Sequence, residues 1–107
     1  MKILILSFYF RPDLCAGSFR ATALVDSLLN CVSAGTHIDV ITTLPNRYHS
    51  FTATAPSAEH KAGMSIFRIA LPNHQSGLLD QSAAFISFAR GAIRQVAGRD
   101  YDIVFAT

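Results

Sequence analysis

The chain has 107 residues, of which 50% are hydrophobic and 15% are charged, and this fits one compact domain rather than a disordered chain or a repeat array. Nine basic and seven acidic residues give a net charge of +2, and the basic residues are scattered, which disfavours binding to nucleic acid. The apolar runs are far shorter than the roughly 20 residues that cross a bilayer, and the N-terminus lacks a signal-peptide pattern. We therefore expect a cytoplasmic protein.

The two cysteines, Cys15 and Cys31, are far apart in the sequence, and no histidine stands next to either of them. This arrangement matches no zinc or iron–sulfur motif, so we expect no metal site. Two free thiols in a reducing compartment are the simpler interpretation, with Cys31 on the buried face of a helix.

The first part of the chain predicts a strand followed by a helix. Residues 2–7 form an almost unbroken aliphatic run, which is typical of a strand buried on both faces of a parallel sheet. Residues 8–17 contain proline and glycine and predict a loop. Ser18 is a suitable N-cap for a helix over residues 19–34, where apolar residues recur at helical spacing before Gly35 ends the helix.

The remainder predicts three more strands and a second helix. Residues 38–43 are β-branched and predict the second strand. Residues 44–64 show no sustained period, contain two prolines, and predict a long irregular connection. The third strand is expected at residues 65–71, an amphipathic helix at residues 80–97, and a fourth strand at residues 101–107.

This order of elements is typical of an α/β fold with parallel strands and right-handed crossovers. We expect a Rossmann-like open parallel sheet of about four strands in the order 3-2-1-4, with helices on both faces and the ligand at the carboxyl ends of the strands. Because an apolar edge strand is usually covered, we also expect residues 1–107 to be one truncated domain of a longer protein.

The common nucleotide-binding motifs of this fold class are missing. No G-x-G-x-x-G follows the first strand, and G-x-x-x-x-G-K-[ST] occurs nowhere, which disfavours an NAD enzyme and a P-loop protein. A two-component receiver domain needs acidic residues where this chain has Ser7-Phe8 and Leu71-Pro72. None of these three classes is supported.

Small residues stand where the first helix is expected to begin. The main-chain N–H groups of Ala16, Gly17 and Ser18, together with the helix dipole, can hold a phosphate, and Arg20 can add positive charge one turn later. A purely structural interpretation fits equally well: Gly17 permits the turn, Ser18 caps the helix and Arg20 is solvated.

Polar side chains also follow the second and third strands. Asn46 and Arg47 come after the second strand, and His74 lies in the turn-rich segment 72–77. Amide, guanidinium and imidazole groups can bind a sugar or a phosphate, although ordinary polar loops have the same composition. Three consecutive aromatic residues, 8–10, must partly face the core, and the rest can line a cleft.

Several segments in order form a recognisable set: the strand KILILS, residues 10–13, Ala16-Gly17, Arg20 and residues 35–42. This set resembles the amino-terminal domain of family 4 retaining glycosyltransferases, which opens with an aliphatic strand, a Y-x-P-P-x-x-G-G-like loop, a helix arginine and G-H-x-V-x-V-x-T. The later segments LPNRYHS, RIALPNHQSGLLDQ, AAFISFARGA and YDIVFAT are similar to the bacterial subgroup that builds O-antigen (lipopolysaccharide) and capsule units, including relatives of N-acetylfucosaminyl transferases. The resemblance spans essentially the whole chain.

The resemblance implies one half of an enzyme with two Rossmann-like domains. In that family the amino-terminal domain mainly holds the acceptor, and the carboxyl-terminal domain holds the nucleotide-sugar donor and carries an E-x7-E motif. Ala16, Gly17 and Ser18 would approach the donor phosphates and Arg20 would be the family arginine, with Ala16 replacing the family's first glycine. The acceptor-side residues would be Phe10, Arg11, Asn46, Arg47 and His74.

We therefore expect the acceptor-side domain of a glycosyltransferase that moves a sugar from a nucleotide-sugar donor to a saccharide or lipid-linked acceptor in cell-surface polysaccharide synthesis. No cofactor is implied, the catalytic residues are not identified, and this chain without E-x7-E is expected to be inactive alone. The alternative is a stand-alone, non-catalytic α/β module that binds a nucleotide or a protein. Phe85, Phe88, Arg90 and Arg94 can form a peripheral contact with the inner face of the cytoplasmic membrane, or the two aromatics can belong to the core.

Overall fold

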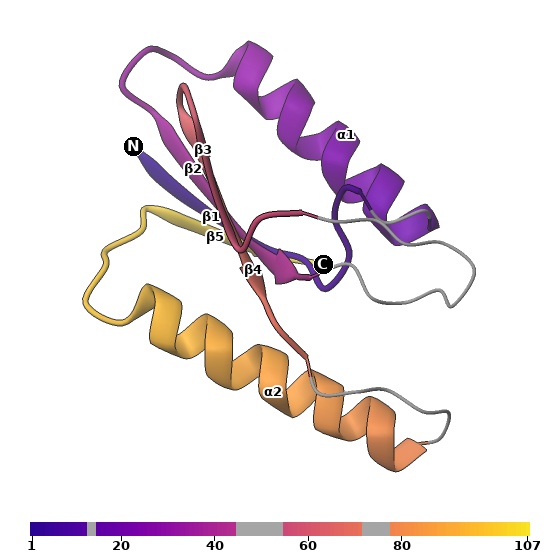
Figure 1. Ribbon diagram of the computed structural model, residues 1–107. Helices are drawn as coiled ribbons and strands as arrows, with labels where there is room; N and C mark the ends of the chain where they lie inside the picture. Colours follow the sequence, from indigo (N-terminus) through magenta and orange to yellow (C-terminus); the bar gives the residue numbers. More distant parts are fainter. Residues whose placement is uncertain (13–14, 45–54, 72–77) are drawn as a thin grey trace.

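The computed structural model describes residues 1–12, 15–44, 55–71 and 78–107. Figure 1 shows a twisted sheet with one helix on each face, which confirms the expected α/β class and the placement of helices on both faces. The elements are β1 (Lys2–Leu6), α1 (Ala16–Cys31), β2 (His37–Thr43), β3 (Ala58–Lys61), β4 (Met64–Ile69), α2 (Leu78–Val96) and β5 (Ile103–Ala106).

The strands of the described residues form one sheet in the order β3-β4-β2-β1-β5. The pairs β4–β2, β2–β1 and β1–β5 are parallel, whereas β3 and β4 are antiparallel. The sheet therefore has five strands, and the expectation of about four was wrong. The additional strand is β3, which lies inside the segment that we interpreted as irregular.

The sequence of β3 explains why it was missed. It is only four residues long, AEHK, and its side chains are largely exposed, so no apolar period marks it. It pairs with β4 across a tight turn in which Gly63 has a φ of +76°, a conformation that favours glycine. A short polar strand at a sheet edge depends on its partner strand rather than on its own sequence.

Each face of the sheet packs against one helix, because side chains alternate between the faces along every strand. This double coverage explains the nearly continuous aliphatic run of β1 and the burial of β2 from Ile38 to Thr43. The core on the α1 side consists of Ile3, Ile5, Phe10, Ala21, Val25, Ile38, Val40, Met64 and Ile66. The core on the α2 side consists of Leu4, Ile41 and Ala92, with Leu6, Phe67, Ile69, Phe88, Val96 and Tyr101 packed against them.

The boundaries of α1 differ from the expected ones. Cys15 has the extended N-cap backbone, and α1 begins at Ala16, so Ser18 is inside the first turn and does not cap the helix. At the other end α1 stops at Cys31, and Gly35 (φ +97°) instead belongs to the turn that leads into β2. Cys31 is exposed rather than buried, because neighbouring leucine and valine side chains of the last turn take the positions that pack on the core.

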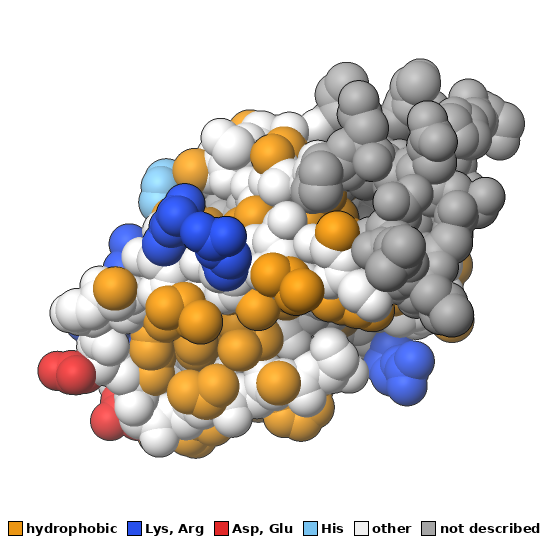
Figure 2. All heavy atoms as spheres, turned by 90° about the horizontal axis from the view of Figure 1, so that it is seen from below, with side chains coloured by type: hydrophobic (Ala, Val, Ile, Leu, Met, Phe, Trp, Pro, Cys, Tyr) orange, Lys and Arg blue, Asp and Glu red, His pale blue; other side chains and the backbone are white. Residues whose placement is uncertain are grey.

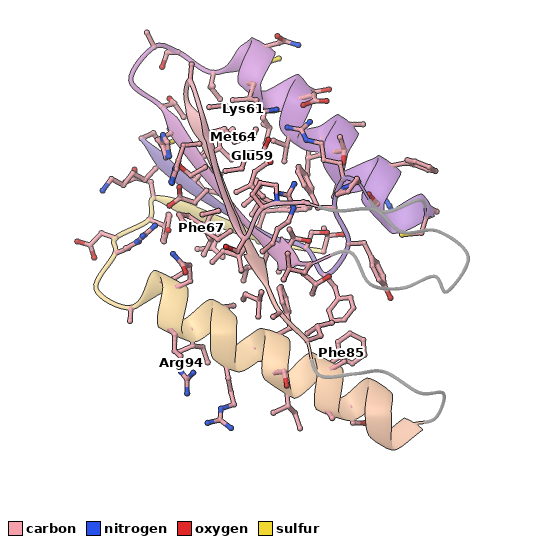
Figure 3. All side chains as sticks on the ribbon, viewed as in Figure 1. Glu59, Lys61, Met64, Phe67, Phe85 and Arg94 are labelled. Carbon is pink, nitrogen blue, oxygen red and sulfur yellow. The ribbon has the colours of Figure 1, made fainter. Side chains whose placement is uncertain are left out.

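Helix α2 carries apolar side chains beyond those that face the sheet. Phe88 packs against the core, but Phe85 and Ile93 are 47% and 67% exposed. Figure 2 shows hydrophobic side chains gathered on the face seen from below, close to basic side chains, and Figure 3 shows Arg94 pointing away from the sheet. Neither helix, as far as its residues are described, has the length and apolar character that crossing a membrane requires.

Candidate functional site

The loop after β1 folds back over the carboxyl ends of the parallel strands. Ser7 Oγ donates a hydrogen bond to the carbonyl of Tyr9 at 2.6 Å. The hydroxyls of Thr42 and Thr43, at the end of β2, donate to the carbonyl of Phe8 at 3.3 and 2.8 Å. These bonds fix the loop at the edge where ligands bind in open parallel sheets.

The first two acceptor-side candidates lie in different surroundings. Phe10 is 1% exposed and belongs to the core on the α1 side, so its ring does not line a ligand surface. Arg11 leaves the core: its guanidinium lies 5.2 Å from the Phe10 ring centre and Nη1 donates to Asp26 Oδ1 at 3.1 Å. The Arg11–Asp26 pair is partly exposed, and such pairs contribute little to stability.

A hollow of about 360 Å³ lies between this loop and the flank of α1, and we call it the α1-flank hollow. Ser18 is 1% exposed, and neither its hydroxyl nor that of Thr22 has a hydrogen-bond partner within the described part of the chain. A buried hydroxyl without a partner costs about 1–3 kcal/mol, so both groups favour a bond to something that enters the hollow. Its lining residues are Arg11, Pro12, Ser18, Phe19, Thr22, Ala23 and Asp26.

The expected phosphate-binding residues are only partly brought together. Ala16, Gly17 and Ser18 are the first three residues of α1, where main-chain N–H groups lack partners within the helix. A side chain at Gly17 would collide with the ring of Tyr9, because its Cβ would lie 2.9 Å from Tyr9 Cδ2. Close packing against Tyr9 is therefore a second explanation for a glycine at this position. Arg20 is exposed and does not line the hollow.

Three candidate residues cannot be placed. Asn46, Arg47 and His74 lie outside the described residues. Of the predicted site residues, Arg11 and Ser18 line the same hollow. Thr22, Phe19 and Asp26, which the sequence analysis did not identify, line it as well. The helical spacing of Ser18, Thr22 and Asp26 would have placed them on one side of α1.

A second polar cluster lies at the opposite, amino-terminal edge of the sheet, and the sequence analysis did not predict it. Its members come from β2, β3, β4 and the α2–β5 connection, so their proximity is a product of the fold. One local signal exists: residues two apart on a strand point to the same face, which applies to His37 and Asp39. We call this second polar cluster the amino-end cluster. It consists of His37, Asp39, His60, Ser65, Arg99 and Tyr101.

These features define an α/β protein with a hydroxyl-lined hollow beside the N-terminus of its first helix. In the described ranges, no three or more His, Cys, Asp or Glu side chains are grouped so that they can hold a metal ion. Comparison of the chain with protein-family models, with curated proteins and with solved structures found no match.

Proposed function

We propose that this chain is the acceptor-side, amino-terminal Rossmann-like domain of a glycosyltransferase, which moves a sugar from a nucleotide-sugar donor to a lipid-linked saccharide in cell-surface polysaccharide synthesis. The observation that carries the proposal is that two buried hydroxyls in the α1-flank hollow, those of Ser18 and Thr22, have no hydrogen-bond partner among the described residues. The ordered resemblance of the sequence to family 4 glycosyltransferases supports it independently.

The chemistry of the hollow suits a saccharide. Sugar hydroxyls both donate and accept, and the hydroxyls of Ser18 and Thr22 can rotate to match either role. At the same hollow Arg11 offers N–H donors and Asp26 offers carboxylate acceptors. Phe19 is 59% exposed and presents an apolar ring against which the C–H face of a sugar can pack. A few convergent polar groups beside an apolar surface are typical of small-molecule sites.

The start of α1 suits an anionic group of the donor. The N–H groups of residues 16–18, which have no partners within the helix, and the positive end of the helix dipole favour phosphate. In the whole enzyme such groups would stabilise the charge that develops on the departing diphosphate. Ser18 belongs to both features, because its main chain lies in the first turn and its hydroxyl is buried at the hollow.

Saccharide binding is tested by titrating the ¹⁵N-labelled chain with N-acetylated hexosamines and with nucleoside diphosphates. Ser18→Ala and Thr22→Val should weaken saccharide binding roughly tenfold, equivalent to about 1.4 kcal/mol. Neither variant should lower the stability, because each removes a polar group that has no partner in the part of the chain that the structure describes. Ser27→Ala, at an exposed position of the same helix, is the matched control.

The outcomes separate the alternatives. Shifts of the α1 amide resonances with saccharides that disappear in both variants support the proposal. Shifts with nucleotides alone favour the stand-alone binding module. Unchanged binding in Ser18→Ala and Thr22→Val overturns the assignment of the hollow.

The transfer reaction is tested on the coding sequence and by assay. A reading frame that continues beyond Thr107 into a second α/β domain with E-x7-E supports the transferase, whereas a stop codon there favours the stand-alone module. Transfer of sugar by residues 1–107 alone would contradict the requirement for a second domain.

Work at the cytoplasmic membrane face would use the surface of α2. Arg90 and Arg94 are exposed on this helix together with Ile86 and Ile93, which are 60% and 67% exposed. Basic and apolar side chains on one helix surface are typical of interfacial helices. Flotation with anionic liposomes should enrich the chain, and Ile93→Glu should abolish the enrichment; equal flotation of both proteins would argue against this contact.

A further inference from the structure

A second hollow, of about 310 Å³, lies at the amino-terminal edge of the sheet on the α2 side, and we call it the amino-end hollow. Phe67, which is labelled in Figure 3, belongs to the core on this side. Helix α2 ends at Val96, and the connection that follows brings Arg99 and Tyr101 to the hollow. The lining residues are Lys2, His37, Asp39, His60, Ser65, Phe67, Arg99 and Tyr101.

Asp39 is the buried centre of this hollow, and both oxygens of its carboxylate contact other side chains. It is 7% exposed. Its Oδ2 accepts hydrogen bonds from the Tyr101 hydroxyl at 2.6 Å and from Arg99 Nη1 at 3.3 Å. Its Oδ1 lies 3.1 Å from His37 Nε2. Burial and the bond to Asp39 raise the pKa of Tyr101, so its hydroxyl stays a donor. The carboxylate of Asp39 therefore contacts three protein groups, of which Arg99 supplies a positive charge.

Ser65 links two histidines beside this carboxylate. His37 Nε2 and His60 Nδ1 each lie 3.0 Å from Ser65 Oγ. Which atom donates in these two contacts depends on the tautomer of each ring. With a hydrogen on His37 Nε2, the atom that also lies beside Asp39, Ser65 Oγ accepts from His37 and donates to His60 Nδ1. In this arrangement the other ring nitrogen of His60 offers a further N–H donor.

Arg99 is held in place but keeps unused donors. Its guanidinium lies 5.0 Å from the ring centre of Phe67 and bonds to Asp39 through Nη1. A guanidinium has five N–H groups, and the side chain of Arg99 is 40% exposed. Lys2 adds an ammonium group to the same lining. Asp102, which accepts a hydrogen bond from the main-chain N–H of Lys2 at 2.7 Å, is not among the lining residues.

We propose that the amino-end hollow binds a small phosphomonoester, with its phosphate held by Arg99, Lys2 and His60. Both carboxylate oxygens of Asp39 already contact protein groups, whereas Arg99, Lys2 and His60 keep donating capacity, which fits a dianion with several acceptor oxygens. Fixing Arg99 by a ring contact and a carboxylate reduces the entropy that binding must overcome. The site lies at the opposite edge from the α1-flank hollow and does not depend on the function proposed for that hollow.

The test uses glycerol 3-phosphate and inorganic phosphate as probes at low ionic strength. Chemical shifts of the His37 and His60 rings and of the Arg99 guanidinium report on the hollow. The Arg99→Gln variant should bind at least tenfold more weakly. Because Arg99 also bonds to Asp39, the exposed Lys2→Gln variant is measured in parallel, with an expected three- to tenfold weakening. Arg94→Gln, the same charge change at a side chain that points away from the sheet, is the matched control.

Saturable shifts that are lost in Arg99→Gln and Lys2→Gln but kept in Arg94→Gln support the proposal. Tighter binding of glycerol 3-phosphate identifies an organic phosphate as the ligand, whereas equal affinities identify free phosphate. The absence of shifts at ~10 mM of either probe overturns the proposal, as does equal weakening in Arg94→Gln, which would indicate general charge attraction. The saccharide titration monitors the amide chemical shifts of α1, whereas the phosphate titration monitors side chains of the amino-end hollow. The proposed function and the phosphate site can therefore fail independently.

Discussion

Gly91 lets α2 approach β4 closely. A Cβ atom at this position would lie 2.7 Å from Cγ2 and 2.8 Å from Cδ1 of Ile69, which is closer than carbon atoms can pack. Because Ile69 is β-branched, its Cγ2 cannot rotate away without changing the preferred side-chain conformation. The contact between helix and sheet therefore depends on a residue without a side chain.

We predict that Gly91→Ala destabilises the protein by about 1–3 kcal/mol, the usual cost of overpacking. At an exposed position of a helix the same substitution would raise the free energy of unfolding by about 1 kcal/mol. The sign of the measured change therefore distinguishes a packed position from an exposed one. Urea unfolding of Gly91→Ala in the wild-type and Ile69→Ala backgrounds measures the energetic coupling between these two positions. The cost should largely vanish when Ile69 is truncated, and an equal cost in both backgrounds would show that the close approach is not its cause.

At the scale of elements, a buried arginine joins β3 to the rest of the molecule. The Arg68 side chain is 2% exposed, and its Nη1 donates to Glu59 Oε2 on β3 at 2.9 Å and to the Pro56 carbonyl at 3.2 Å. Its Nη2 donates to the carbonyl of Arg11 at 3.1 Å, which ties the loop after β1 to the same group. The hydrogen bond from Arg68 lowers the pKa of Glu59, although burial of the carboxyl opposes this effect.

We predict that Glu59→Gln lowers the free energy of unfolding by about 1–2 kcal/mol at neutral pH, because Arg68 stays buried without its carboxylate. A carboxyl with a lowered pKa stabilises the fold above its ordinary pKa of 4.5, and this contribution is lost as the pH falls through the lowered value. The difference between wild type and variant should therefore shrink in acid. Urea unfolding at about pH 7 and about pH 3 measures it. Lys61→Gln, which removes the longer 3.6 Å contact to Glu59, should have a smaller effect.

The sequence predicted the helices and strands that are determined by their own residue pattern. β1 was recognisable because a strand covered on both faces is largely aliphatic, and β2 because its residues are β-branched. α1 and α2 were recognisable because their apolar residues recur at helical spacing. The existence of β3 depends on pairing with β4 and on the Arg68–Glu59 contact, which no local pattern reveals. The last strand was expected at residues 101–107, whereas β5 covers Ile103–Ala106.

The candidate sites likewise differ in how far the sequence predicts them. Parallel topology and the small residues before α1 pointed to the carboxyl edge of the sheet, and Ser18 and Arg11 do line a hollow there. The amino-end hollow could not be found in this way, because Asp39 and its partner Tyr101 are 62 positions apart in the sequence. Contacts of this kind are set by the fold as a whole.

At the scale of the whole molecule, one side of the protein presents an uncovered apolar surface. Among the described strands β5 pairs only with β1, and its residues Ile103, Val104 and Phe105 are 48%, 58% and 45% exposed. Between β5 and α2 lies a hollow of about 370 Å³ with a mainly apolar lining that includes Ile93. An apolar edge strand with free main-chain groups can pair with another chain.

We predict that the chain self-associates with increasing concentration through this surface. Val104→Lys places a charge on the edge strand, and Ile93→Glu places one on α2; each should shift sedimentation-velocity profiles toward the monomer. Both positions are more than half exposed, so thermal unfolding of the variants should change little. Asn30→Lys, at an exposed position of α1 on the other face of the sheet, adds a charge without touching this surface and serves as the control. If Val104→Lys and Ile93→Glu associate as strongly as Asn30→Lys at the same concentrations, another surface mediates the association.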